Sequence, residues 1–417
     1  MPDVGAAWQR AVFVARSHAR PFVHWRVPIA RITGRRPGTT REATLVVAGW
    51  KRSVEYYVRR FLDEPIRREP LTRTPMLRLS SVLEREGGDA DLILARVPRP
   101  SASWLFGDAW LRVPEGVAAR LEVPDNPDDL SRASTRARRN VRRIRKNALN
   151  WSVSVSRDDF ELFYRDYYVP FLNRRYGDMG TQFDRRRLAG WFRRGCILWI
   201  HKDDRRVAAA LLQPDGPVLR WWVMGARTDG EDPVKTGALA AIYLFGAECA
   251  RRYGFRRFDV GFSVASLRDG VLSHKRSWGV TLHDSPMVDL DLVFRWDRFG
   301  DGLADFLAET PLIFREAGKL SAVAALPAEQ DPDPAAARRI HGKIAMPGLH
   351  RLYIVARSGW TTTGAEGAAE PGDNLWLATP GGSRSFRESA TRCPPIRSGS
   401  PRRTARSEES VGSTQHA

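Results

Sequence analysis

The sequence predicts a mixed α/β protein (α/β with α+β character) with two related domains in tandem. Its 417 residues are enough for two folded domains. The composition, 42% hydrophobic and 28% charged, is typical of a globular protein with a sizeable core. From residue 151 to residue 260, strand-like and helix-like hydrophobic patterns follow one another in the order β-α-α-β-β-β-α-β.

The cysteines and histidines indicate neither a disulfide scaffold nor a metal centre. Cys196, Cys249 and Cys393 are far apart and form no CxxC pair, which fits a reducing compartment. The eight histidines are scattered, and no pair has metal-ligand spacing. The sequence has no run of about 18 apolar residues and no apolar segment typical of a secretory signal. We therefore expect a cytoplasmic protein that binds no metal.

The net charge points to an acidic partner. Lys and Arg number 67 against 48 Asp and Glu, which gives +19. Such a balance favours nucleic acid, nucleotide phosphates or anionic lipid headgroups as partners. Only seven of the 67 basic residues are lysines, however, and GC-rich codon usage produces the same excess of arginine. Both interpretations of the charge stay open.

The first 125 residues divide into a basic arm and a domain. Residues 1–42 are rich in arginine with apolar residues between, as in an arm packed on the domain or a segment at a membrane surface. From residue 43 to residue 125 the pattern is that of an α/β domain. We expect a helix over 54–62 and three strands, over 44–48, 91–97 and 119–123.

Residues 126–150 form a basic linker with one helix. Asn126 and Pro127 are typical of a helix start. Residues 131–146 then hold eight basic side chains and no acidic one, with small and apolar residues at spacings of three and four. A solvated surface helix usually mixes both signs. A helix of one sign is better explained by contact with phosphate, and we assign Arg138 and Arg142 to substrate binding.

The second domain is predicted over residues 151–360. A strand at 151–155 is followed by helices at 158–175 and 184–194 and by three strands at 196–201, 206–213 and 217–224. A helix over 237–253 and a strand over 255–260 complete the pattern. Residues 361–417 contain one short apolar patch among Gly, Ser, Pro and Arg, so we expect a disordered tail.

Three motifs resemble the FemAB-like branch of the GNAT acyltransferase superfamily. The strand Phe258-Asp-Val-Gly-Phe-Ser263 matches F-D-x-G-x-S, and His274-Lys-Arg-Ser-Trp-Gly279 is similar to F-K-x-x-[FW]-G. The basic helix, with Arg138, Asn140 and Arg142, resembles the R-x-N-I-R stretch before the catalytic half. The resemblance covers residues 131–282, and it implies tandem GNAT-like domains.

The resemblance also implies where the site lies. Asp259, at the end of a buried strand, would orient or deprotonate the acceptor, and capping the next loop is the alternative. Ser263 would bond a leaving group, although serine is also ordinary in a turn. Lys275, a lysine in an arginine-rich chain, would hold a donor phosphate. These three are our expected catalytic residues.

The donor and the acceptor would meet beside them. Thr236 and Gly237 begin a helix whose free N–H groups favour an anion. Trp222 would line the donor groove and Tyr176 the acceptor cleft, with core packing as the alternative for both. The Q/R-x-x-G-x-G/A loop of acetyl-CoA-dependent members is absent around Gly237, which leaves the identity of the donor open.

The function that we expect is acyl transfer. An acetyl or other acyl group would move from acyl-CoA to an amine or hydroxyl of a sugar or cell-envelope precursor. One alternative is an aminoacyl-tRNA-dependent peptidyltransferase of peptidoglycan synthesis, which the basic charge favours. The other is a non-enzymatic binder of nucleic acid or of the membrane surface on a degenerate fold. The expected partners are an anionic substrate, tRNA in the first alternative, and peripheral membrane.

Overall fold

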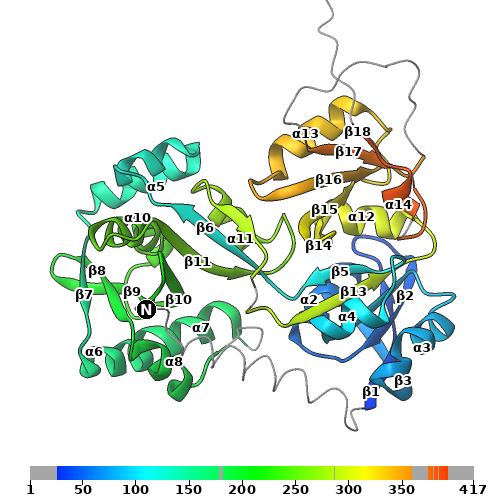
Figure 1. Ribbon diagram of the computed structural model, residues 1–417, viewed down its shortest axis with the longest axis horizontal. Helices are drawn as coiled ribbons and strands as arrows, with labels where there is room; N and C mark the ends of the chain where they lie inside the picture. Colours follow the sequence, from blue (N-terminus) through cyan, green and yellow to red (C-terminus); the bar gives the residue numbers. More distant parts are fainter. Residues whose placement is uncertain are drawn as a thin grey trace, which may run out of the picture.

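The computed structural model describes residues 26–177, 182–285, 287–358, 374–378, 380–383 and 385–392. They form three mixed sheets with helices packed against them, so the mixed α/β prediction is confirmed (Figure 1). The six-stranded sheet has the order β3 (Asp63–Pro75), β1 (Arg26–Arg35), β2 (Glu42–Ala48), β4 (Leu92–Pro98), β13 (Leu290–Arg295), β5 (Leu111–Pro114). The seven-stranded sheet has the order β12 (Thr281–His283), β6 (Val117–Glu122), β11 (Arg257–Ser263), β10 (Val218–Ala226), β9 (Arg205–Asp215), β8 (Cys196–Lys202), β7 (Asn150–Ser154).

Part of the expected N-terminal arm is an integral strand. β1 pairs antiparallel with both β2 and β3, and its side chains Ile29 and Ile32 are buried. The expectation of an arm over 1–42 is therefore wrong from residue 26 on, and residues 1–25 lie outside the described part of the chain. Because arginines alternate with small and apolar residues along β1, its apolar face is hard to recognise in the sequence.

The two halves of the chain exchange strands. β6 follows the first half, yet it joins the seven-stranded sheet between β12 and β11. β13 follows the second half, yet it lies between β4 and β5 in the six-stranded sheet. Figure 1 shows β6 running among the strands of the second half and β13 beside β5. A single domain boundary at residue 125 is thus wrong, since hydrophobic pattern does not say which sheet a strand joins.

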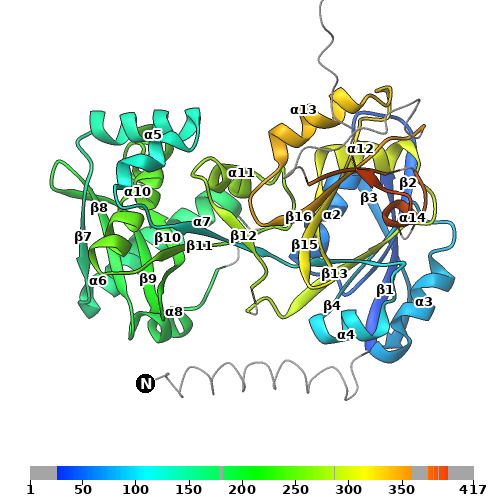
Figure 2. The ribbon, with the colours of Figure 1, turned by 45° about the horizontal axis from the view of Figure 1, so that its top comes forward.

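A third sheet follows, in the order β14, β15, β16, β17, β18 (Leu312–Glu316, Lys319–Ala325, Leu349–Val355, Leu375–Ala378, Thr391–Arg392). Helices α12 (Asp301–Glu309) and α13 (Pro334–Ile344) accompany it (Figure 2). The expected C-terminal domain over 151–360 therefore contributes strands to three different sheets. β17 lies in the segment expected to be disordered, and Leu375 and Leu377 are both 1% exposed. The tail prediction is wrong there, because the short apolar patch pairs in parallel with β16.

Deleting residues 361–417 is expected to destabilise the protein. The deletion removes β17 and uncovers its buried leucine contacts, and truncation of one buried leucine typically costs about 2–5 kcal/mol. Urea unfolding of a chain ending at Trp360 should give a free energy lower by at least roughly 3 kcal/mol. A chain ending at Arg392, which keeps β17 and β18, is the matched control. Equal stability of the Trp360 chain and the full chain would contradict the packing of β17.

The helices of the second half place the site. The predicted order is confirmed: β7 leads through α6 (Arg157–Leu162), η4 (Phe163–Tyr168), α7 (Val169–Tyr176) and α8 (Arg185–Phe192) to β8, β9 and β10. α9 (Pro233–Thr236) and α10 (Ala238–Arg252) then lead to β11. α10 and the basic helix α5 (Thr135–Lys146) lie on one side of the sheet, and α6, α7 and α8 on the other (Figures 1 and 2). α11 (Gly270–Arg276) follows β11.

The remaining helices of the described residues belong to the first half, to the linker and to the end of the chain. They are α2 (Arg52–Phe61), η2 (Met76–Arg78), α3 (Leu79–Glu86), α4 (Arg99–Leu105), η3 (Pro127–Arg132) and α14 (Ser385–Glu388). The helix expected over 54–62 is thus confirmed as α2, and the strands expected over 44–48 and 91–97 are confirmed as β2 and β4.

Candidate active site

The parallel strands β10 and β11 are paired at their starts only. Val218–Arg220 of β10 pairs with Arg257–Asp259 of β11, whereas β10 continues to Ala226 and β11 to Ser263. An irregularity between Trp221 and Val223 interrupts the β10–β9 ladder, and another between Asp259 and Phe262 interrupts the β11–β6 ladder. Bulges of this kind bend a strand and redirect its side chains. The second halves of β10 and β11 therefore run without mutual pairing.

Gly261 permits the bend in β11. Its φ is +76°, a left-handed conformation that favours glycine. A Cβ at this position would also lie 3.2 Å from the carbonyl oxygen of Trp221 on β10. The F-D-x-G-x-S pattern thus has a structural cause, since the glycine fixes the bulge directly after Asp259.

Asp259 lies at the point where the two strands part. Its side chain is 1% exposed, and its Oδ1 accepts a hydrogen bond of 2.9 Å from the backbone N–H of Gly261. The loop-capping role is thus present. Its Oδ2 faces three nitrogens at longer distances: Arg220 Nη1 at 3.5 Å, Arg120 Nε at 3.6 Å and His283 Nε2 at 3.7 Å.

Several polar atoms of this cluster are buried without a hydrogen-bond partner among the described residues. They are Asp259 Oδ2, Arg120 Nε and both ring nitrogens of His283; Ser263 Oγ, further along β11, is likewise buried without such a partner. Buried polar groups are normally hydrogen-bonded, whereas Arg120, Arg220 and His283 meet Asp259 Oδ2 only as ion pairs of 3.5–3.7 Å. Ser263 was predicted, but Arg120, Arg220 and His283 were missed. Arg120 and His283 come from β6 and β12, and the sequence does not reveal that these strands flank β11.

Lys275 binds backbone rather than an open phosphate site. It is 3% exposed, and its Nζ donates bonds of 2.8 Å to the carbonyl oxygens of Gly261 and Phe262. Burial lowers the pKa of Lys275 to about 7, while the carboxylates of Asp259 and Asp269 act in the opposite direction. The lysine therefore holds the bulge that positions Asp259. The role expected from the sequence, a phosphate contact, does not fit this environment.

The start of α10 is covered by the basic helix. Arg143 Nη1 donates to the carbonyl oxygen of Val234 at 3.3 Å, and Asn147 Nδ2 donates to that of Thr236 at 3.0 Å. Gly237 has a φ of +86°, and a Cβ there would lie 3.2 Å from the Arg143 side chain. Thr236 and Gly237 thus lie beside the Arg143 side chain, which was not among the predicted site residues.

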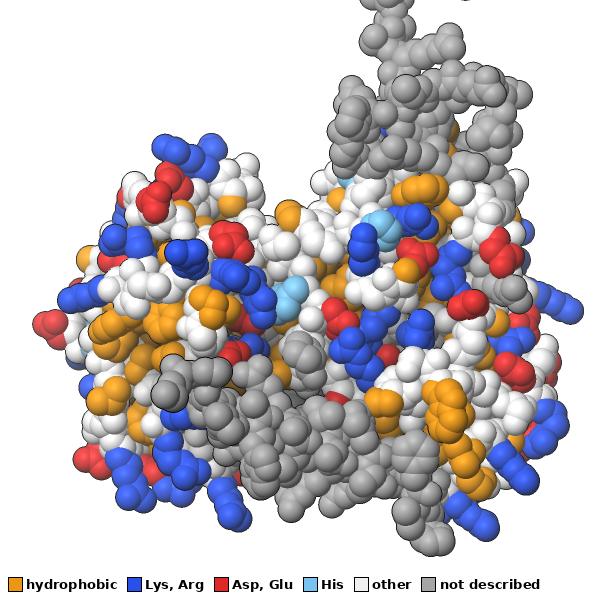
Figure 3. All heavy atoms as spheres, viewed as in Figure 1, with side chains coloured by type: hydrophobic (Ala, Val, Ile, Leu, Met, Phe, Trp, Pro, Cys, Tyr) orange, Lys and Arg blue, Asp and Glu red, His pale blue; other side chains and the backbone are white. Residues whose placement is uncertain are grey.

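Arg138 and Arg142 point elsewhere. Both are exposed on α5, together with Arg136, Arg139, Arg145 and Lys146. Arg145 pairs with Asp128 at 2.6 Å. Lys and Arg side chains project over this part of the molecule in Figure 3. On α5, Arg143 therefore points toward α10, whereas the other basic side chains form a cationic face toward solvent.

Trp222 lies on the face of the sheet that α8 covers. Its ring stacks on Trp191 with centroids 4.0 Å apart, and its Nε1 donates to Gln213 Oε1 at 2.8 Å. Trp221 packs on the other face against Tyr243 of α10. Trp222 therefore lies with the α8 side chains and not with those of α10. Tyr176 ends α7, and its side chain lies outside the described part of the structure.

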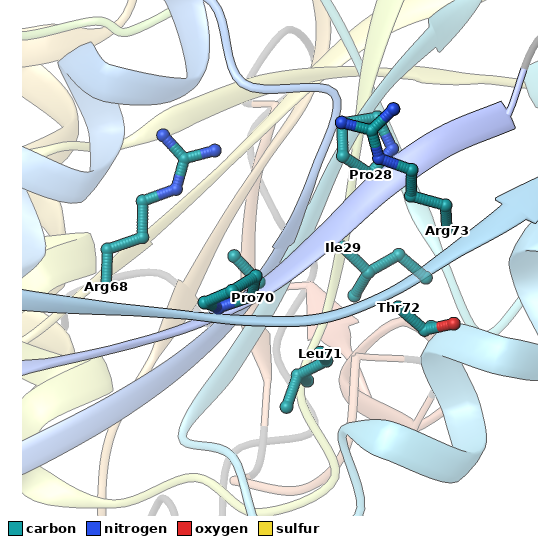
Figure 4. Close-up of a pocket in the computed structure, with 8 residues that line it drawn as sticks. Pro28, Ile29, Arg68, Pro70, Leu71, Thr72 and Arg73 are labelled. Carbon is teal, nitrogen blue, oxygen red and sulfur yellow. The ribbon is translucent and has the colours of Figure 1, made fainter.

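The described residues form no metal centre, and the hollow shown in Figure 4 lies apart from this site. Within the described ranges, no group of three or more His, Cys, Asp and Glu side chains could hold a metal ion. Figure 4 shows a shallow hollow between β1 and β3, lined by Pro28, Pro70, Arg68 and Arg73 among others. It contains no residue of the cluster around Asp259. No helix in the described part of the chain is long and apolar enough to cross a bilayer.

From β7 to β11 the strands and helices follow the order that the sequence predicted. No protein-family model and no curated protein matches the chain. Among solved structures, it is similar to FemX, with 12% identity over 64% of this chain and 84% of that chain and a TM-score of 0.34. It is also similar to the C-terminal domain of a putative lysylphosphatidylglycerol synthetase from Agrobacterium fabrum (10% identity, 68% and 91% coverage, TM-score 0.32). A GCN5-related N-acetyltransferase from Kribbella flavida matches with 10% identity, 82% and 85% coverage and a TM-score of 0.29.

Proposed function

We propose that this protein is an acyltransferase whose donor binds between the diverging halves of β10 and β11. The observation that carries the proposal is the partial pairing of these strands, with Asp259 buried where they part. An acyl donor has a narrow arm that ends in a thioester or ester. Unpaired edges of two strands offer it backbone N–H and C=O groups, and the arm would bring the reacting carbonyl toward Asp259.

The phosphates of the donor fit the start of α10. A helix N-terminus favours an anion through its free N–H groups and its dipole. Arg143 adds a half-buried cation beside the buried Gly237, where the missing Cβ leaves room for the Arg143 side chain. In this proposal Arg143 binds the donor, Thr236 and Gly237 cradle it, and Lys275 positions Asp259.

In this proposal the acceptor approaches Asp259 from the side opposite the donor. Transfer to an amine or hydroxyl requires that the nucleophile lose a proton while charge develops on the carbonyl oxygen. The unpaired atoms around Asp259 include both hydrogen-bond acceptors and donors, as an amine or hydroxyl requires. We propose that the acceptor is a sugar or cell-envelope precursor.

Acyl-CoA is the donor that we favour, and aminoacyl-tRNA is the second candidate. The exposed cationic face of α5 favours tRNA, because a polyanion needs several phosphate contacts. Both donors would place the reaction in the cytoplasm, and a peripheral membrane contact would suit a lipid-linked acceptor. The test is transfer of a radiolabelled acyl group from each donor to envelope precursors. If the purified protein transfers from neither donor while binding RNA or anionic vesicles, the protein is a non-enzymatic binder.

Two sets of α5 variants are expected to distinguish the donors. Arg143→Gln should weaken acyl-CoA binding about tenfold, because one charge-assisted bond is lost. The triple variant Arg138→Gln, Arg142→Gln, Lys146→Gln should leave acyl-CoA binding nearly unchanged, since these side chains face solvent. With aminoacyl-tRNA, the triple variant should bind more weakly and with a flatter salt dependence. Calorimetric titration at two salt concentrations measures both effects, and equal binding by Arg143→Gln and wild type would remove Arg143 from the donor site.

A further inference from the structure

His283 is the histidine of the cluster around Asp259, and nothing in the sequence motifs points to it. It ends β12, where it is paired in register with Ala118 of β6. Its side chain is 19% exposed, and both of its ring nitrogens are buried. The Nε2 atom lies 3.7 Å from Asp259 Oδ2, and neither ring nitrogen has a hydrogen-bond partner within the described residues.

The geometry points to His283 as a catalytic residue that accepts the proton of the acceptor nucleophile, with Asp259 as its orienting partner. The inference rests on the proposed acyl transfer. A buried imidazole with two free nitrogens beside a carboxylate can hold one N–H toward that carboxylate and leave the other nitrogen as a proton acceptor. Asp259 alone is less suited to this task, because it already accepts the Gly261 N–H and faces two guanidinium groups.

The step balances without any further reactant. The nitrogen or oxygen of the acceptor forms a bond to the acyl carbon, and the carbon–sulfur bond of the thioester, or the carbon–oxygen bond of the ester, breaks. The acceptor proton passes to the imidazole of His283. The leaving thiolate or alkoxide keeps the bonding electron pair and then takes this proton from the imidazolium, which restores neutral His283.

The charges around His283 keep it neutral before the reaction. Burial, Arg120 of β6 and Arg220 of β10 lower the pKa of His283 to about 4, while Asp259 of β11 and the adjacent Asp284 act in the opposite direction. A neutral imidazole is the form that can accept a proton. The rate of acyl transfer should therefore fall at low pH, where His283 becomes protonated. Replacing one of these charged neighbours should move the pH of that fall in a known direction.

The test is the pH dependence of single-turnover acyl transfer by the full chain. His283→Gln should lower the transfer rate at pH 7 by a factor of about 10²–10⁴, with the acceptor KM nearly unchanged. Arg120→Gln removes a cation, so the acid limb should move to higher pH, whereas Asp259→Asn should move it to lower pH. His201→Gln is the matched control, because His201 is half-buried on β8 of the same sheet and bonded to Ser152.

The outcomes separate the inference from the function on which it rests. A wild type that transfers the acyl group, with a folded His283→Gln variant that is equally fast, would overturn the role of His283 and leave the acyltransferase intact. An acid limb that stays in place in Arg120→Gln would also overturn that role. Because Arg120 Nε also lies 3.6 Å from Asp259 Oδ2, the deciding readout is the loss of the wild-type acid limb in the folded His283→Gln variant. A wild type inactive with both donors would overturn the proposed function, and the inference with it.

Discussion

Replacing Asp259 with asparagine is expected to lower kcat by two to four orders of magnitude, as for loss of a group essential to proton transfer. The carboxylate is the acidic group that faces Arg120, Arg220 and His283 together. An amide keeps the size and the Gly261 contact, but it cannot balance the two guanidinium groups or accept an N–H bond from His283 with the same strength. Steady-state kinetics should show a small change in the donor KM.

Asp215→Asn is the matched control for this variant. Asp215 accepts a bond of 2.8 Å from Arg220 Nη2, so the control also removes a carboxylate partner of Arg220. It leaves the cluster around Asp259 Oδ2 intact, and kcat should stay within about threefold of wild type. Circular dichroism and urea unfolding establish that both variants fold. Equal losses in the two variants would mean that Asp259 acts only by fixing Arg220.

Replacing Lys275 with methionine is expected to change both kcat and the pH dependence of stability. Without the ammonium, the carbonyl oxygens of Gly261 and Phe262 lose their shared donor and the bulge after Asp259 relaxes. We expect kcat to fall about 10–100-fold with the donor KM unchanged, because Lys275 touches backbone rather than phosphate. A raised donor KM with normal kcat would instead restore the phosphate role expected from the sequence.

The sign of the stability effect follows from the pKa of Lys275, about 7 in the folded chain against 10.5 for an ordinary lysine. Between these values the unfolded chain binds more protons, so wild-type stability rises with pH. The methionine variant lacks this contribution. From pH 7 to pH 9.5, wild type should gain roughly 3 kcal/mol relative to the variant in urea unfolding. Parallel pH profiles for the two proteins would contradict the buried state of this ammonium.

Local pattern predicted the second half well. The aromatic stripe of α6 and α7, the run of three antiparallel strands and the glycine after α10 each follow from hydrophobic period and turn chemistry. Asp259 and Ser263 were predicted from the strand motif, and each has a buried side-chain oxygen without a hydrogen-bond partner among the described residues. These features depend on residues close in sequence, so the sequence alone was sufficient.

Non-local pairing explains what was missed. Arg120 and His283 belong to the site because β6 pairs with β11 and β12 pairs with β6. The order of strands in a sheet cannot be predicted from the hydrophobic periodicity of the sequence. β17 was missed because four residues bury little apolar area until β16 supplies a partner. Lys275 was predicted to bind phosphate because lysine is rare in this chain. Its environment is instead set by the bulge at Phe262, thirteen residues earlier in the sequence.

The central claim is that the acyl donor binds where β10 and β11 part. Hydrogen–deuterium exchange of the full chain, with and without acetyl-CoA and with and without aminoacyl-tRNA, tests it most directly. We predict that one donor slows exchange in residues 222–226 and 260–263 and at the start of α10, residues 236–240, since bound donor would shield these backbone amides. Protection that is confined to other segments, or exchange unchanged by either donor at saturating concentration, would contradict the claim.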